Sequence, residues 1–224
     1  MCFSANASFT AGTVLTIIGV ASVLKAPHRS QILFASIPFL FGIQQLAEGI
    51  LWLTLPDPHN ILTQKVFTYI FLFFAQVVWP VWVPLAFLLL EKSTNRRTGQ
   101  KMLVAAGALV GLYLFYCLLN YNVTARIEQR HIVYLQEYPS IFRGYGVALY
   151  ALATVAPPFF SSIRRMWIFG LAIMASYIIS ALFYEHYVLS VWCFFASIIS
   201  IVAYLIILKL GREKQMKNYS ATFI

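Results

Sequence analysis

Charged residues are scarce in this 224-residue sequence: Lys, Arg, Asp and Glu together make up 10% of it, and only 7 residues are acidic. Soluble domains carry about a quarter of their residues as charged side chains, so the composition excludes a soluble globular protein. Hydrophobic residues make up 61% of the chain, and they are gathered into long blocks between short polar stretches. The composition therefore predicts an integral membrane protein.

The apolar blocks also lack the short polar-apolar alternation of a membrane barrel, and their length and richness in Leu, Ile, Ala and Phe favour helices. A helix rising about 1.5 Å per residue needs roughly 20 apolar residues to cross a bilayer. We predict an all-α fold, one domain over residues 1–224, with seven transmembrane helices. Their expected ranges are about 7–25, 31–55, 64–90, 101–121, 144–163, 166–184 and 187–209.

Lys and Arg are nearly missing from every second loop. Of the 16 basic residues, 12 fall in the first, third and fifth loops and the C-terminal tail. The positive-inside rule then predicts an external N-terminus and a cytoplasmic C-terminus. Basic loops beside anionic lipid account for the net charge of +9, so we expect the bilayer and no nucleic acid as a partner. No basic residue precedes the first block, so we expect that helix to remain in the mature protein.

The longest loop runs from Asn122 to Arg143 and lies on the external side of this topology. It is the one loop long enough to form a small external cap. Its charges at Arg126, Glu128, Arg130 and Glu137 predict a solvated helix with local ion pairs rather than a binding site.

One acidic residue, Glu48, falls inside an apolar block. Gln44, Gln45 and Trp52 lie at helical spacing around it, so the four side chains lie on or beside one helix face. A carboxyl group at this depth must be protonated, paired or exposed to a water-filled cavity, and it is the first functional candidate. The alternative is a neutral Glu48 that bonds to a neighbouring helix and holds the bundle together.

The last block carries a polar stripe at steps of three and four residues: His186, Ser190, Cys193, Ser197, Ser200 and Tyr204. This face must point into the bundle. The three cysteines Cys2, Cys117 and Cys193 fall in the outer half, where they form a Cys2–Cys193 disulfide, remain inert thiols, or bind a metal. Candidate metal ligands are Glu48, His186, Cys193 and Cys2, but CxxC, HxxxH and HExxH motifs are absent.

The third block contains Gln76 and Trp79, followed by prolines at 80 and 84. Proline removes a backbone donor, so this helix is expected to bend or open, and the freed carbonyls can line a cavity. Pro157 and Pro158 predict a similar break in the fifth block. A static kink is the alternative to a ligand site or hinge.

Several segments together resemble a family of small bacterial membrane proteins of unassigned function. They are the opening MCFSANASF, the run from Gln44 to Trp52, the segment from Pro80 to Glu91, and SVWCFFA at 190–196. The resemblance implies the bacterial inner membrane as the location. It also implies that one feature contains the six motif positions Cys2, Gln45, Glu48, Trp52, Trp192 and Cys193.

Three functions stay open on this evidence. The first is an outward-facing polar pocket around Glu48 that binds or transports a small ligand or ion, with protonation of Glu48 coupled to binding. The second is a membrane enzyme, with or without a bound metal, in which Glu48, His186 and Cys193 act on a lipid or quinone at the outer leaflet. The third is a membrane sensor whose basic tail contacts a partner. No cofactor is predicted beyond the possible metal ion.

Overall fold

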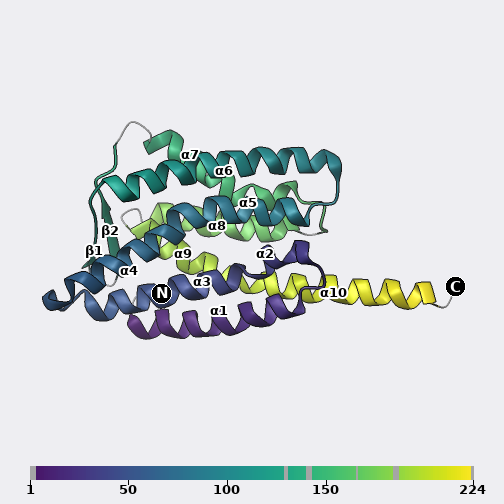
Figure 1. Cartoon of the computed structure of the whole chain (residues 1–224), viewed down its shortest axis with the longest axis horizontal. Helices are drawn as coiled ribbons and strands as arrows, with labels where there is room; N and C mark the ends of the chain where they lie inside the picture. The colour runs from purple at the N-terminus through teal and green to yellow at the C-terminus, as the bar shows by residue number, and fades with distance from the viewer. Residues whose placement is uncertain (1–3, 129–130, 140–142, 165, 184–186, 223–224) are drawn as a thin grey trace.

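A computed structural model describes residues 4–128, 131–139, 143–164, 166–183 and 187–222. These residues form a helical bundle with one two-stranded hairpin (Figure 1). The helices are α1 (Ala5–Lys25), α2 (Ile32–Ala35), α3 (Ile37–Thr54), α4 (Ile61–Phe73), α5 (Trp79–Leu90), α6 (Thr94–Asn120), α7 (Arg143–Val155), α8 (Met166–Phe183), α9 (Val188–Ile199) and α10 (Ile201–Thr222). Short 3-10 turns precede α2, precede α4 and follow α7, and a π-helical turn, Phe74–Val78, joins α4 to α5.

Six helical stretches are long and apolar enough to cross a membrane: Ala5–Lys25, Arg29–Thr54, Pro58–Leu90, Thr94–Asn120, Met166–Phe183 and Val188–Arg212. The predicted all-α class is therefore confirmed, and six of the seven predicted helices are long and apolar enough to cross a membrane. The expected fifth span, 144–163, is wrong in length, because α7 ends at Val155. Pro157 and Pro158 follow at once in a 3-10 turn, and neither has the N–H that would continue an α-helix.

The predicted external helix between residues 122 and 143 is also wrong. Strands β1 (Val123–Glu128) and β2 (His131–Gln136) form an antiparallel hairpin there, with Arg126 opposite Val133. The expected local ion pair does form, between Arg126 and Glu128 on the exposed side of β1. Apolar and aromatic residues of β2 face the bundle and override the helical charge spacing, with Ile132 fully buried and Tyr134 stacked on Phe71 at 4.5 Å.

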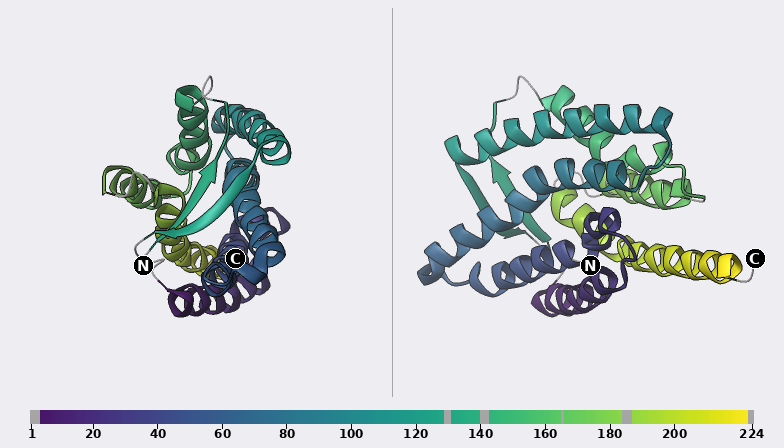
Figure 2. Two further views of the ribbon diagram at one scale, coloured as in Figure 1. Left: turned by 90° about the vertical axis from the view of Figure 1, so that its left-hand side faces the viewer. Right: turned by 45° about the vertical axis from the view of Figure 1, so that its right-hand side comes forward.

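The hairpin and the C-terminus lie at opposite ends of the bundle (Figure 1). The end-on view in Figure 2 shows the two strands lying obliquely across the helices. Helix α10 runs past the far end of the bundle, so the helix predicted to stop near Lys209 continues to Thr222. The turns between α5 and α6 and between α7 and α8 lie at the same end as this extension. The bundle thus places these two turns and the C-terminal extension at one end and the hairpin at the other.

Glycine allows two helix pairs to approach at backbone distance. A Cβ on Gly19 of α1 would lie 2.3 Å from the backbone nitrogen of Phe39 at the start of α3. A Cβ on Gly107 of α6 would lie 1.8 Å from the carbonyl oxygen of Pro80 in α5. That oxygen is free to face α6 because Pro84, four residues on, has no N–H to bond it. The pairs α1–α3 and α5–α6 are therefore fixed by shape.

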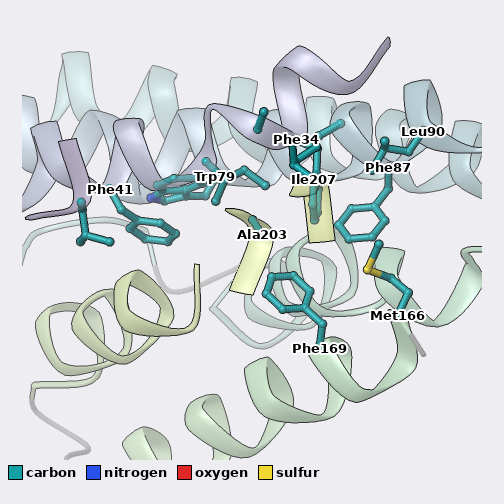
Figure 3. Close-up of a cluster of buried hydrophobic side chains, with 13 residues drawn as sticks. Phe34, Phe41, Trp79, Phe87, Leu90, Met166, Phe169, Ala203 and Ile207 are labelled. Atoms are coloured by element: carbon teal, nitrogen blue, oxygen red, sulfur yellow. The ribbon is translucent and has the colours of Figure 1, made fainter. Parts of the chain in front are cut away.

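An aromatic core fills the end of the bundle away from the hairpin (Figure 3). Phe34 is fully buried there and meets Phe87 edge to face at 5.4 Å and Phe169 at 6.2 Å. Ile207 of α10 packs into the same cluster. This core joins α2, α5, α8 and α10, elements that are far apart in the sequence.

A buried carboxylate holds two turns together at this end of the bundle. Glu91, only 1% exposed, follows α5 and accepts hydrogen bonds from the backbone N–H of Ser93 at 2.8 Å and of Ser162 at 2.6 Å. Burial alone raises the pKa of Glu91, but hydrogen bonds from Ser162, Ser93 and Lys92 outweigh it and hold that pKa below its usual value of 4.5. The charged form of Glu91 thus joins the α5–α6 turn to the α7–α8 turn.

We expect Glu91→Gln to destabilise the protein at neutral pH by about 1.5–3 kcal/mol for each bond lost, because an amide is a poorer acceptor than a carboxylate. The folded-state pKa is lowered, so this stabilisation is present above about pH 4.5 and is lost as the pH falls through the folded value. Unfolding titrations of both proteins between neutral and acid pH should converge at the acid end. A constant difference across this range would contradict the assignment.

Candidate functional site

Glu48 of α3 lies completely buried against α9. The hydroxyl of Ser190 donates a hydrogen bond to its Oε1 at 2.6 Å, and both side chains are 0% exposed. Glu48 lines none of the three cavities described among these residues. It lies instead in the contact between two helices, as the alternative prediction of interhelical bonding describes.

A second polar bridge lies one helical turn along the same contact. Gln44 donates from Nε2 to the sulfur of Cys193 at 3.4 Å, and its Oε1 accepts from the indole Nε1 of Trp79 at 2.7 Å. The ring of Trp79 in turn stacks on Phe41 at 3.8 Å. Because residues 44 and 48 of α3 and residues 190 and 193 of α9 each lie about one turn apart, the two bridges bind these helices in register.

Gln45 and Trp52 do not join these bridges. Gln45 is 0% exposed, and neither its amide nitrogen nor its amide oxygen has a hydrogen-bond partner among the described residues. The indole nitrogen of Trp52 is likewise buried without an acceptor in the described part of the chain. The structure therefore divides the predicted face of α3 in two, with Gln44 and Glu48 bonded to α9 and Gln45 and Trp52 beside them.

Gln76 belongs to a different network, below the hairpin. It accepts a hydrogen bond from the hydroxyl of Tyr138 at 2.9 Å and donates to the side chain of Gln136 at 3.0 Å. Burial raises the pKa of Tyr138 well above its ordinary value, so the phenol keeps its proton at physiological pH. Gln76 thereby ties the π-helical turn to the end of β2.

The π-helical turn itself follows from the prolines. Pro80 has no N–H to donate to the carbonyl of Gln76, and the helix widens over Phe74–Val78 just before it. The carbonyl of Ala75 in this turn accepts a hydrogen bond from the hydroxyl of Tyr150 in α7. The predicted helix opening is confirmed, and its freed backbone binds a neighbouring helix.

Two cavities meet beside this turn. The hairpin cavity has a volume of about 270 Å³ and lies between the end of the hairpin and helices α6, α7, α8 and α9. The core cavity is smaller, about 50 Å³, and lies deeper in the bundle, where Trp79 and Cys193 line it. Tyr150 and Trp192 line both cavities, so these two rings stand between them.

Trp192 sits between two tyrosines at this boundary. Its ring meets Tyr177 edge to face at 5.1 Å and Tyr150 at 5.8 Å. Trp192 is 8% exposed, and its indole Nε1 is buried with no acceptor among the described residues. A buried donor without a partner is unusual in a native protein and calls for an explanation.

The sequence identifies part of this site and misses part. Gln76, Trp79, Trp192 and Cys193 do lie on cavity walls, but Tyr138, Gln136, Tyr150 and Tyr177 were not among the candidates. Tyr138 and Gln136 lie in the segment expected to be a solvated helix. Alternating apolar residues in His131–Gln136 were the available signal for a strand.

The metal hypothesis gains no support. No group of three or more His, Cys, Asp or Glu side chains comes together among the described residues. Cys2 and His186, two of the four predicted ligands, lie outside the described residues. Cys117 and Cys193 are buried and form no disulfide with one another, and the predicted Cys2–Cys193 pair lies partly outside the described residues.

Comparisons with known proteins give one match. Residues 1–219 match the model of a family described as a family of unknown function (DUF6629). No curated protein matches, and no solved structure matches. The match agrees with the resemblance to an uncharacterised family noted in the sequence.

We expect Ser190→Ala to destabilise the protein by about 1–3 kcal/mol, because it leaves a buried carboxyl oxygen without its donor. Ser197→Ala is the matched control: Ser197 is equally buried on the same helix, but its hydroxyl bonds to Phe194 within that helix at 2.7 Å. Reversible unfolding in mixed detergents measures both. Equal losses in the two variants would contradict a specific bond between α3 and α9.

Proposed function

The chain belongs to DUF6629, a family of unknown function, and we propose that it is a membrane protein that binds a small ligand in the hairpin cavity. The observation that carries this proposal is an apolar, aromatic-lined cavity with a few polar side chains on its wall. Its volume of about 270 Å³ is close to the lower limit of small-molecule sites, which are mostly apolar with a few polar groups that orient the ligand. The rings of Tyr150, Tyr177 and Trp192 line it, together with the polar side chains of Gln76 and Tyr138.

The membrane setting is the second part of the proposal. The protein lies in the bacterial inner membrane with the hairpin outside and α10 in the cytoplasm. The uneven distribution of Lys and Arg between the two ends of the bundle supports this orientation. The hairpin cavity then opens near the external side.

Helix α9 gives Glu48 a role in this site although Glu48 does not line the cavity. Ser190 of α9 bonds to Glu48, and two residues later Trp192 lines the cavity. A change in the proton content of Glu48 alters its bond to Ser190 and hence the position of α9. We therefore propose that binding, and any transport that follows, is coupled to protonation of Glu48.

The enzyme and sensor alternatives have less support. Acid-base chemistry needs a second reactive group within hydrogen-bond reach of Glu48, and its bonded neighbour with known geometry is Ser190. The helical extension of α10 in 210–222 provides a surface for a partner, but no observation identifies one.

Gly146→Phe tests the site. Gly146 lines the hairpin cavity, and a Cβ built there meets nothing within 4 Å, so a benzyl group can occupy the cavity without displacing the helix. Native mass spectrometry of the protein in lipid nanodiscs should show a bound organic mass in the parent and its loss, by about tenfold or more, in the variant.

Gly144→Phe is the matched control for this experiment. Gly144 lies on the same helix, a Cβ there also meets nothing within 4 Å, and it does not line the cavity. This variant should keep the bound mass. A parent protein that carries no organic mass, or a mass that persists in Gly146→Phe, would overturn the proposed function.

Glu48→Gln tests the coupling, because Gln keeps an acceptor for Ser190 but cannot release a proton. We expect the parent to bind its ligand with an affinity that changes with pH and Glu48→Gln to bind it with a constant affinity. Binding measured across pH in nanodiscs decides this, with Cys193→Ser as control because it alters the neighbouring Gln44–Cys193 bridge of the same helix contact and leaves Glu48 in place. The same pH dependence in Glu48→Gln would remove Glu48 from the mechanism.

A further inference from the structure

The hairpin cavity and the core cavity follow one another along the same helix faces. On α9, Leu189 lines the hairpin cavity, Trp192 lines both, and Ala196 and Ser200 line the core cavity. Steps of three and four residues place these side chains on one face of the helix. The lining residues of α7, of α8 and of the stretch from the π-helical turn through α5 are spaced in the same way. The two cavities together therefore form one track between four helices.

The track is long and slender. Its lining runs from Val188 to Ser200 on one side and from Ala75 to Phe87 on another, and each run is about 18 Å at about 1.5 Å per residue. An extended carbon chain with bonds of about 1.5 Å advances roughly 1.3 Å per carbon, so about 14 carbons span this length. The volumes of about 270 Å³ and about 50 Å³ hold about ten methylene-sized groups of roughly 30 Å³ each. One unbranched chain fits both the length and the volume.

The deep part of the track, the core cavity, favours an apolar occupant. The hydroxyl groups of Thr154 and Ser200 on its wall donate to carbonyl groups of their own helices, and the indole of Trp79 donates to Gln44. The indole nitrogen of Trp192 is enclosed by protein atoms, so it does not meet a ligand. A polar group placed in the core cavity would lose its hydration without gaining these bonds, which is unfavourable.

Polar side chains gather at the other end of the track. Gln76, Gln136 and Tyr138 line the hairpin cavity there. The half-buried Gln136 uses its amide oxygen to accept the bond from Gln76, and an amide nitrogen carries two further N–H donors. The nitrogen of Gln136 can therefore donate to an oxygen atom of a ligand whose apolar part lies deeper in the track.

We propose that the track binds a single unbranched acyl chain of about ten to fourteen carbons, with its carboxyl or ester end at Gln136 and its methyl end in the core cavity beside Ala196. This inference rests on the proposed function, since it names the ligand class of the same site. A free fatty acid and one chain of a membrane phospholipid share this chemistry. The mass that the parent protein carries when isolated distinguishes the two sources.

A series of chain lengths tests the proposal. The protein in mild detergent is incubated with an equimolar mixture of straight-chain fatty acids of roughly six to eighteen carbons, and native mass spectrometry measures how much of each is bound. We expect occupancy to rise about tenfold or more from the shortest chain to a maximum near ten to fourteen carbons and then to fall. A caged acid of similar carbon number, adamantane carboxylic acid, should not bind, because it is too wide for a slender track.

Ala196→Val tests the position of the methyl end. Ala196 lines the core cavity, and two added methyl groups of roughly 30 Å³ each fill its volume of about 50 Å³. The preferred chain should become shorter by about two carbons, while shorter chains bind as they do to the parent. Ala175→Val is the matched control, since Ala175 is exposed on α8 and lines none of the three cavities. Helical circular dichroism of each variant excludes loss of folding.

Gln136→Leu tests the other end of the chain. This substitution removes the donor for the acyl oxygen and leaves the core cavity as it is. Every chain length should therefore bind about tenfold more weakly, with the preferred length unchanged. A change of preferred length in Gln136→Leu would contradict the assigned direction of the chain.

The outcomes distinguish this inference from the proposed function. Occupancy that is independent of chain length, binding of the caged acid as tight as that of a straight chain, or a preferred length that Ala196→Val leaves unchanged overturns the acyl-chain proposal. A bound organic mass that Gly146→Phe removes would still support the hairpin cavity as a ligand site in that case. No bound mass in the parent together with no retention of any chain would overturn both.

Discussion

The bundle depends on one constraint: a polar group buried among apolar helices must find its partner on another helix. Glu48 and Gln44 of α3 meet it through Ser190 and Cys193 of α9. These two bridges join helices that are about 150 positions apart in the sequence. They also set the rotation of α9, and that rotation is what turns Trp192 toward the cavities.

Among the described residues, the buried acidic side chains Glu48 and Glu91 meet this constraint with different kinds of partner. Glu91 lies at the end of the bundle and binds two backbone N–H groups, so its charge is stabilised by the loops that it joins. Glu48 lies within an interhelical contact and has a hydroxyl donor at 2.6 Å. Glu91 thus has backbone donors that favour its charged form, whereas Glu48 bonds to a side-chain hydroxyl of a neighbouring helix.

Much of the fold could be read from the sequence because its strongest signal is the length of apolar blocks. The helices and the alternation of loops between the two ends follow from that signal and from the basic residues. Glu48 and Cys193 were expected at a similar depth in the bundle. The structure agrees, because Cys193 bonds to Gln44, which lies one helical turn from Glu48 on α3. The stripe of Ser190, Cys193, Ser197 and Ser200 is buried as its spacing predicted.

The rest depends on contacts that no local pattern records. The hairpin is stabilised by what it covers, including the stacking of Tyr134 on Phe71, so charge spacing alone pointed to a helix. Gln76 was grouped with Glu48 because both are polar and buried, but its partners come from β2 and the residues after it. The unused donor of Trp192 is visible only once every neighbouring group has been placed.

The glycine contacts determine which parts of the bundle can move. Backbone lies against backbone where Gly19 meets Phe39 and where Gly107 meets Pro80, so neither pair can slide or separate without opening a void. Each pair therefore behaves as a rigid body. Neither Gly144 nor Gly146 of α7 has a neighbour within 4 Å of a built Cβ, so these two glycines do not lock α7 to a neighbouring helix as Gly19 and Gly107 lock theirs.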